Sequence, residues 1–178
     1  MSRLALVLLL ASGGAAAAEP SAWCDALFPV GDIAAVIGAE RAAGIERRAS
    51  GVVAEDARHC SRLYSIGEDR FSDELVFMVS PARDAAGAVR TIESIARGDG
   101  GRRFGESRPE GLGAAAVHFR APDPLASHRM EFNVSFALGD RVIELRYFNV
   151  DDGKQNKYLQ ASSELEAIAR RIAERGLP

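Results

Sequence analysis

The clearest pattern in the chain is a strict alternation of hydrophobic and polar residues in "HRMEFNVSFAL", residues 128–138. A period of two is typical of a β-strand with one buried face. The segment "RVIELRYFNV" (141–150) follows after Gly-Asp at 139–140, which predicts a hairpin with a two-residue turn. The predicted inward residues of the first strand are Met130, Phe132, Val134, Phe136 and Leu138, and its outward residues are Arg129, Glu131, Asn133 and Ser135.

The hairpin register follows from the same pattern. Pairing Leu138 with Arg141 keeps the hydrophobic residues of both strands on one face, whereas a one-residue slip would scramble both faces. The outward side chains then pair Ser135 with Glu144 and Asn133 with Arg146. Outward residues Asn133, Glu144 and Arg146 would face solvent in the simplest case and would be contact positions in a binding protein.

Three further segments, 60–66, 74–80 and 113–119, have the composition and spacing of strands. Segment 74–80 carries hydrophobic residues on both faces, including Val76 and Met78 on its second face, so we expect a central strand covered on both sides. The residues on the first faces are Cys60, Tyr64 and Ile66, then Leu75, Phe77 and Val79, and finally Ala115, Val117 and Phe119.

Helical spacing marks the remaining hydrophobic segments. "DIAAVIGAE" (32–40) predicts a short helix that Asp32 caps and Gly38 ends. A second helix follows Pro81, and the chain closes with a long amphipathic helix over 151–175. The second helix has one hydrophobic stripe, formed by Ala85, Ala88, Val89, Ile92, Ile95 and Ala96.

The order of these elements, roughly α-β-β-α-β-β-β-α, predicts an α+β fold with helices packed on an antiparallel sheet. Residues 39–57 are charged and rich in small residues, and there we expect at most a short strand at Val52–Val53. No repeat or low-complexity linker divides the chain, so residues 19–178 are predicted to form a single domain.

The first 18 residues have the pattern of a secretory signal peptide. Arg3 precedes a hydrophobic run over 4–10, and Ala16-Ala17-Ala18 offers a cleavage site. Cleavage would lower the formal net charge from −3 to −4, and an acidic domain is not expected to bind nucleic acid. We therefore expect a periplasmic or secreted protein without a transmembrane segment in the mature chain.

The two cysteines are the next question. Cys24 follows Trp23 and lies about fourteen residues beyond the hydrophobic run, which argues against lipid attachment. In an exported chain, Cys24 and Cys60 most simply form a structural disulfide, although free thiols or a redox-active pair are alternatives. Closing a loop of about 36 residues would stabilise the fold by about 3–4 kcal/mol in the chain-entropy model.

Motifs with chemical meaning are sparse. His118 and His128 flank a loop that contains Asp123, but strand parity places the two histidines on opposite faces, which disfavours a metal site. His59 is expected beside the disulfide at a strand end. His118 has the outward parity of its strand, and we expect His118 and His128 to be polar residues at strand ends. The sequence shows no catalytic serine, cysteine or zinc motif, and we predict neither a catalytic residue nor a cofactor.

The segments "CDALFPVGDIAAVIG", "CSRLY" and "GLGAAAV", with the closing helix, resemble small secreted bacterial proteins of unknown function with a PsbP-like or related α/β sandwich. In those proteins Gly-Leu-Gly is often followed by Asp, whereas Ala114 follows it here. The resemblance implies a fold and a compartment, and it implies no activity.

Taken together, these patterns predict a non-catalytic binding or accessory module that contacts a protein or small molecule in the cell envelope. The partner would meet the sheet face or the loops at its edge, whereas an ordered, protruding loop at 98–108 or 120–127 would favour an inhibitor. The alternatives are an envelope hydrolase whose site is dispersed over loops and an inhibitor of another envelope protein.

Overall fold

The computed structural model describes residues 22–48, 58–66, 73–98, 103–122, 129–150 and 162–177. Within them the helices are α1 (Ala22–Leu27), α2 (Val30–Ile37), α3 (Ala39–Ala42), α4 (Ala85–Arg97) and α5 (Ser162–Arg175). The strands are β1 (Ile45–Arg48), β2 (Cys60–Ile66), β3 (Asp73–Pro81), β4 (Phe104–Ser107), β5 (Ala115–Pro122), β6 (Arg129–Leu138) and β7 (Arg141–Val150).

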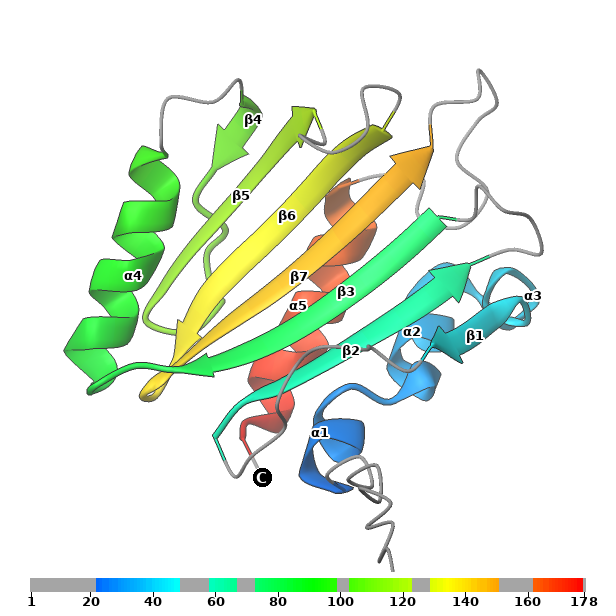
Figure 1. The fold of residues 1–178 in the computed structure, drawn as a ribbon, viewed down its shortest axis with the longest axis horizontal. Helices are drawn as coiled ribbons and strands as arrows, with labels where there is room; N and C mark the ends of the chain where they lie inside the picture. The colour runs from blue at the N-terminus through cyan, green and yellow to red at the C-terminus, as the bar shows by residue number, and fades with distance from the viewer. Residues whose placement is uncertain are drawn as a thin grey trace, which may run out of the picture.

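All described strands belong to one antiparallel sheet in the order β1-β2-β3-β7-β6-β5-β4. In Figure 1 α5 crosses behind the middle of the sheet, and α4 stands beside β5 at one end. This arrangement is the predicted α+β fold. Its β6–β7 hairpin has the predicted register, with Leu138 opposite Arg141 and Phe136 opposite Ile143.

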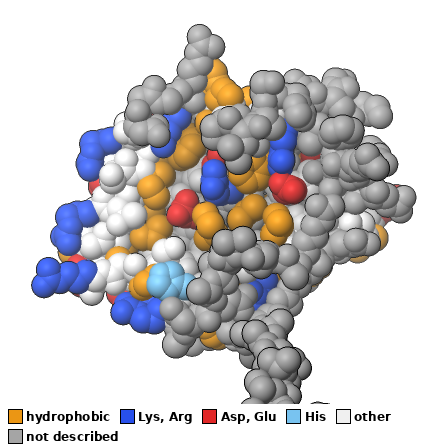
Figure 2. Space-filling model, in the orientation of Figure 1, with side chains coloured by type: hydrophobic (Ala, Val, Ile, Leu, Met, Phe, Trp, Pro, Cys, Tyr) orange, Lys and Arg blue, Asp and Glu red, His pale blue; other side chains and the backbone are white. Residues whose placement is uncertain are grey.

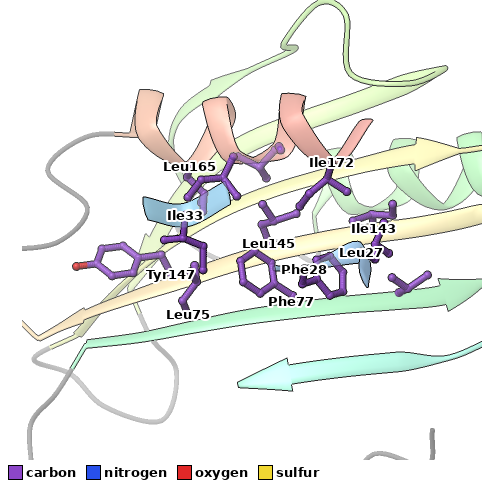
Figure 3. Packing of buried hydrophobic residues seen from close by; sticks show 14 of the residues in the cluster. Leu27, Phe28, Ile33, Leu75, Phe77, Ile143, Leu145, Tyr147, Leu165 and Ile172 are labelled. Atoms are coloured by element: carbon purple, nitrogen blue, oxygen red, sulfur yellow. The ribbon is translucent and has the colours of Figure 1, made fainter. Parts of the chain in front are cut away.

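The main hydrophobic core lies between the sheet and α1, α2 and α5. Phe28 stacks on Phe77 with ring centroids 4.8 Å apart, and Tyr64 meets Phe77 edge-on at 5.6 Å. The Tyr64 hydroxyl donates a hydrogen bond of 2.9 Å to the carbonyl oxygen of Phe28, so the ring is buried without an unsatisfied oxygen. Figure 3 shows Leu165 and Ile172 of α5 above the same layer.

A smaller core forms under α4, on the other face of the sheet. The predicted stripe of α4 is confirmed except at Ala85, which is exposed; Ala88, Ile92 and Ala96 are buried, and Val89 and Ile95 are half-buried. They pack against Val117, Phe119, Ala137 and Val142 of β5, β6 and β7. Asp84 is the N-cap of α4, and its side chain accepts a hydrogen bond of 2.6 Å from the Gly87 amide.

The predicted disulfide is present. Cys24 in α1 and Cys60 at the start of β2 are both buried, and their Cα atoms lie 5.8 Å apart. Beside the bond, the Nε of Arg62 donates to Asp25 at 2.7 Å. The disulfide therefore ties the first helix to the sheet, where a cross-link over 36 residues contributes about 3–4 kcal/mol by limiting the unfolded chain.

Position 113 requires glycine because the backbone there passes very close to β6. Its φ is +60°, and a Cβ atom there would lie 1.9 Å from the carbonyl oxygen of Ala137. The next amide, that of Ala114, donates a hydrogen bond of 3.0 Å to this oxygen. A side chain at position 113 would therefore displace the backbone where β5 begins to pair with β6.

Several expectations need correction. Asp32 is not the cap of α2, because the helix already begins at Val30 after Pro29; Asp32 instead forms an ion pair with Arg175 of α5. The short elements α1, α3, β1 and β4 were not predicted, since segments of four to six residues carry little periodicity. The expected strand at Val52–Val53 and the first part of the last helix, 151–161, lie outside the described residues.

By the described helices, strand β3 is covered on only one side. Leu75, Phe77 and Val79 are buried under the helices of the main core, whereas Val76 and Met78 on the other face are half-buried. The expected cover on both sides is incorrect because α4 packs on β5, β6 and the start of β7. This leaves part of the second face of the sheet without a described helix over it.

Candidate functional site

The part of the sheet that α4 does not cover is the candidate site, and we call it the α4-free face. It lies opposite the main core and combines half-buried hydrophobic side chains with charged ones, as the middle of Figure 2 shows. Its residues on β2, β3 and β7 are Leu63, Val76, Met78, Glu144, Arg146 and Phe148, and those on β6 are Glu131, Asn133 and Ser135.

A chain of hydrogen bonds runs along β6 at one side of this face. Arg146 binds Glu131 with both ends of its guanidinium group, Nε to Oε1 at 2.7 Å and Nη2 to Oε2 at 2.8 Å. Asn133 Nδ2 donates to Glu131 Oε1 at 3.4 Å, and Ser135 Oγ donates to Asn133 Oδ1 at 2.7 Å. Two-point pairing fixes the orientation of Arg146 as well as its charge.

The ring of Phe148 lies close to two arginines on the same face. The guanidinium groups of Arg129 and Arg146 lie 5.0 and 5.2 Å from its ring centroid. Arg129 also donates to Glu74 at 2.6 Å. Two arginines are thus compensated by two glutamates around one aromatic ring, and each cation–π contact adds about 0.5–1 kcal/mol.

Glu144 differs from the other charged residues here. In the sheet register it lies between Met78 of β3 and Ser135 of β6. Neither a hydrogen bond nor a salt bridge joins it to another described residue. Burial raises the pKa of Glu144; the charge of Arg146 lowers it by less, and the charge of Glu131 raises it further. Among the described charges of this face, Glu144 is the one without a direct partner.

The predicted cross-strand pairs are confirmed, since Glu144 lies opposite Ser135 and Arg146 opposite Asn133. The solvent-facing option, however, is wrong for Asn133. The exposed fractions of Glu131, Asn133 and Ser135 are 6%, 2% and 0%. Parity predicted which residues share the face, but it gave no sign that Glu131, Asn133 and Ser135 are buried and hydrogen-bonded to one another along β6.

His118 also departs from its prediction. It was assigned to a polar strand end, but its exposed fraction is 5% and its Nδ1 lies 2.7 Å from Oε1 of Glu166 on α5. Both faces of β5 are covered, since Val117 and Phe119 pack under α4 while His118 meets α5. The burial of its two neighbours suggested that His118 points outward, and sequence alone held no sign of Glu166.

The other sequence candidates are only partly described. His59 lies directly before β2 and the disulfide-bonded Cys60, as expected. His128 and Asp123 lie outside the described residues, so the comparison of the two flanking histidines stays a prediction. Within the described part of the chain, no group of three or more His, Cys, Asp or Glu residues is placed to hold a metal ion.

Part of the segment 98–108 forms a strand rather than a loop, and residues 99–102 within it lie outside the described residues. Gly98 ends the helix, and residues 104–107 form the edge strand β4. Arg103 lies over the ring of Phe119 at 4.0 Å and donates to the carbonyl oxygen of Ile95 at the end of α4. Of the second loop, 120–122 belong to β5 and 123–127 are not described.

In comparisons with known proteins, no family model, curated protein or solved structure matches the chain. The resemblance to PsbP-like proteins therefore stays a prediction. Among the described helices, none combines the length and hydrophobicity required to span a membrane.

Proposed function

We propose that the protein is an exported, non-catalytic binding or accessory module of the cell envelope and that it contacts its partner through the α4-free face. The observation that carries the proposal is the composition of this face. Half-buried Leu63, Val76 and Met78 lie beside an ordered network of charges. Hydrophobic side chains next to paired arginines and an aromatic ring are typical of protein–protein interfaces.

The internal hydrogen bonds support this choice of surface. Arg146 is held by Glu131 and lies near the ring of Phe148, so its position is set before any partner binds. Ordering long side chains costs entropy on association, and a face that is ordered beforehand avoids part of that cost. A sheet also presents its side chains from rigid backbone rather than from a loop.

Export is supported by the signal-like first 18 residues and by the Cys24–Cys60 disulfide, because disulfides persist in oxidising compartments. Intact mass spectrometry of the protein from its own host tests this part. We expect the mass of residues 19–178 less two hydrogens. A mass that begins at Cys24 and includes an acyl group would instead place the protein on a membrane.

Photo-crosslinking tests the surface. Purified protein carrying p-benzoylphenylalanine at Val76 is irradiated with the envelope fraction of the host, and a matched control carries the probe at Ser94 on the exposed side of α4. We expect one discrete product from position 76 that excess unlabelled protein abolishes. Equal products from both positions, or products that resist competition, would contradict the assignment of this face.

A further inference from the structure

Among the described side chains of the α4-free face, the negative charges outnumber the positive ones. Arg146 is engaged by Glu131 and Arg129 by Glu74, at donor–acceptor distances of 2.6–2.8 Å. Glu144 has no such partner, so the described charges of the face leave one carboxylate in excess. The whole chain carries a formal net charge of −3, in the same direction.

The surroundings of Glu144 restrict what could compensate it. Met78 is its neighbour on β3, and Val76 is the next residue of that strand on the same face. Ser135, its neighbour on β6, already donates its hydroxyl hydrogen to Asn133. The carboxylate therefore lies between a hydrophobic strip on one side and an occupied hydrogen-bond chain on the other. A complementary group must bring both a positive charge and hydrophobic surface.

Lysine and arginine side chains combine these properties, because a charged end group follows an aliphatic stem. We propose that the partner is a protein segment that places one Lys or Arg side chain against Glu144, with the stem over Met78 and Val76. This inference rests on the proposed function, since it names the chemistry of the partner that the α4-free face binds.

An anionic partner fits less well. Both arginines of the face already bind carboxylates, so an incoming anion would have to displace Glu131 or Glu74. Glu131 is buried, and leaving it without Arg146 would be costly. A cation at Glu144 requires no existing pair to break. When a partner covers the face, Glu144 loses hydrating water, and a cation from the partner compensates for that loss.

A probe experiment tests this charge preference without the natural partner. Isotope-labelled protein is titrated with n-hexylammonium, and amide chemical shifts are followed by NMR; n-hexanoate and n-hexanol serve as anionic and neutral probes of similar length. We expect n-hexylammonium to bind most tightly and to shift the amides of Met78, Ser135 and Glu144. Equal or tighter binding of n-hexanoate would overturn the proposal.

Matched variants separate the local carboxylate from overall charge. Glu144→Gln should weaken n-hexylammonium binding by about three- to tenfold, the size expected for a partly exposed charge-assisted contact. Glu174→Gln removes the same charge from an exposed site on α5 and should leave the affinity unchanged. Equal effects of the two variants, or none in Glu144→Gln, would refute a cation contact at Glu144.

The outcome is distinct from that of the crosslinking experiment. A specific product at position 76 together with no preference for the cationic probe would retain the docking face and reject the basic partner. Sedimentation of the wild-type protein tests whether a second copy of the same chain binds the α4-free face. We expect a monomer, and a dimer that dissociates in Glu144→Gln would replace the proposed partner by the protein itself.

Discussion

The two faces of the sheet are built on different physical principles, although the same strands form both. The face toward α5 is hydrophobic, and its aromatic rings meet in one stacked and one edge-on contact, with centroids 4.8 and 5.6 Å apart. In the described part of the chain, the α4-free face contains the ion pairs of Arg146 and Arg129, a hydrogen-bond chain, and the carboxylate of Glu144, which no described residue pairs with. Burial of hydrophobic surface stabilises the first face, whereas charge pairing mainly orders the second. The first should therefore govern folding and the second recognition.

The largest expected effect compares two neighbours on β3 that point to opposite faces. Phe77→Ala should lower the free energy of unfolding by about 3–5 kcal/mol, because it leaves a cavity among Phe28, Tyr64 and Leu145. Met78→Ala on the half-buried side should cost about 1 kcal/mol. Urea denaturation of both variants measures the difference. Similar losses at the two positions would contradict the distinction between the faces.

The disulfide belongs to the hydrophobic face, and its loss should come next. The double variant Cys24→Ser, Cys60→Ser should lose about 3–4 kcal/mol, since the 36-residue separation is no longer constrained in the unfolded chain. Thermal unfolding measures it, with the wild-type protein under reducing and non-reducing conditions as a control. A variant as stable as the oxidised protein would show that the tie between α1 and β2 contributes nothing.

Arg146→Ala should have an intermediate effect, of about 2 kcal/mol. It leaves the buried carboxylate of Glu131 without its two-point partner and removes the contact with Phe148. Arg90→Ala, on the exposed side of α4, is the control and should change stability by no more than about 0.5 kcal/mol. If both substitutions are neutral, the ion pairs of the α4-free face do not order it.

The smallest expected effect is that of Glu144→Gln on stability, and its direction depends on pH. Burial raises its pKa above 4.5, so the folded state binds a proton more readily than the unfolded state does. The associated stability is present at acidic pH and is lost as the pH rises through the raised pKa. Glu144→Gln should therefore stabilise the protein at pH 7 by about 0.5 kcal/mol.

The same substitution should bring no gain near pH 4, where wild-type Glu144 is mostly protonated in both states. Denaturant curves of the variant and the wild type at the two pH values measure the difference. A gain at pH 4 that equals the gain at pH 7 would exclude titration of Glu144 as its cause. A loss at pH 7 would show that the charged form is favoured in the fold.

Sequence reasoning was strongest where a pattern allowed one solution. The alternation over β6 and β7 determined the hairpin register, because a shift by one residue would expose Phe136 and bury Arg146. The hydrophobic stripe of α4 and the pairing of the only two cysteines were equally constrained. In the hairpin and in α4 the spacing of hydrophobic residues specifies which residues share a face, and with only two cysteines there is only one possible pair.

Only the tertiary structure decided which helix covers which part of each face. Alternation assigns Asn133 and His118 to a side of their strands, but it does not say what packs there. Asn133 is buried in a hydrogen-bond chain, and His118 meets Glu166 from a helix 48 residues away. The position of Glu144 beside Met78 likewise depends on β3 pairing with β7, across the intervening helix and three strands. Local periodicity holds no information about contacts between residues so far apart in the sequence. The surroundings of the Glu144 carboxylate, which distinguish the candidate site, are set by such contacts.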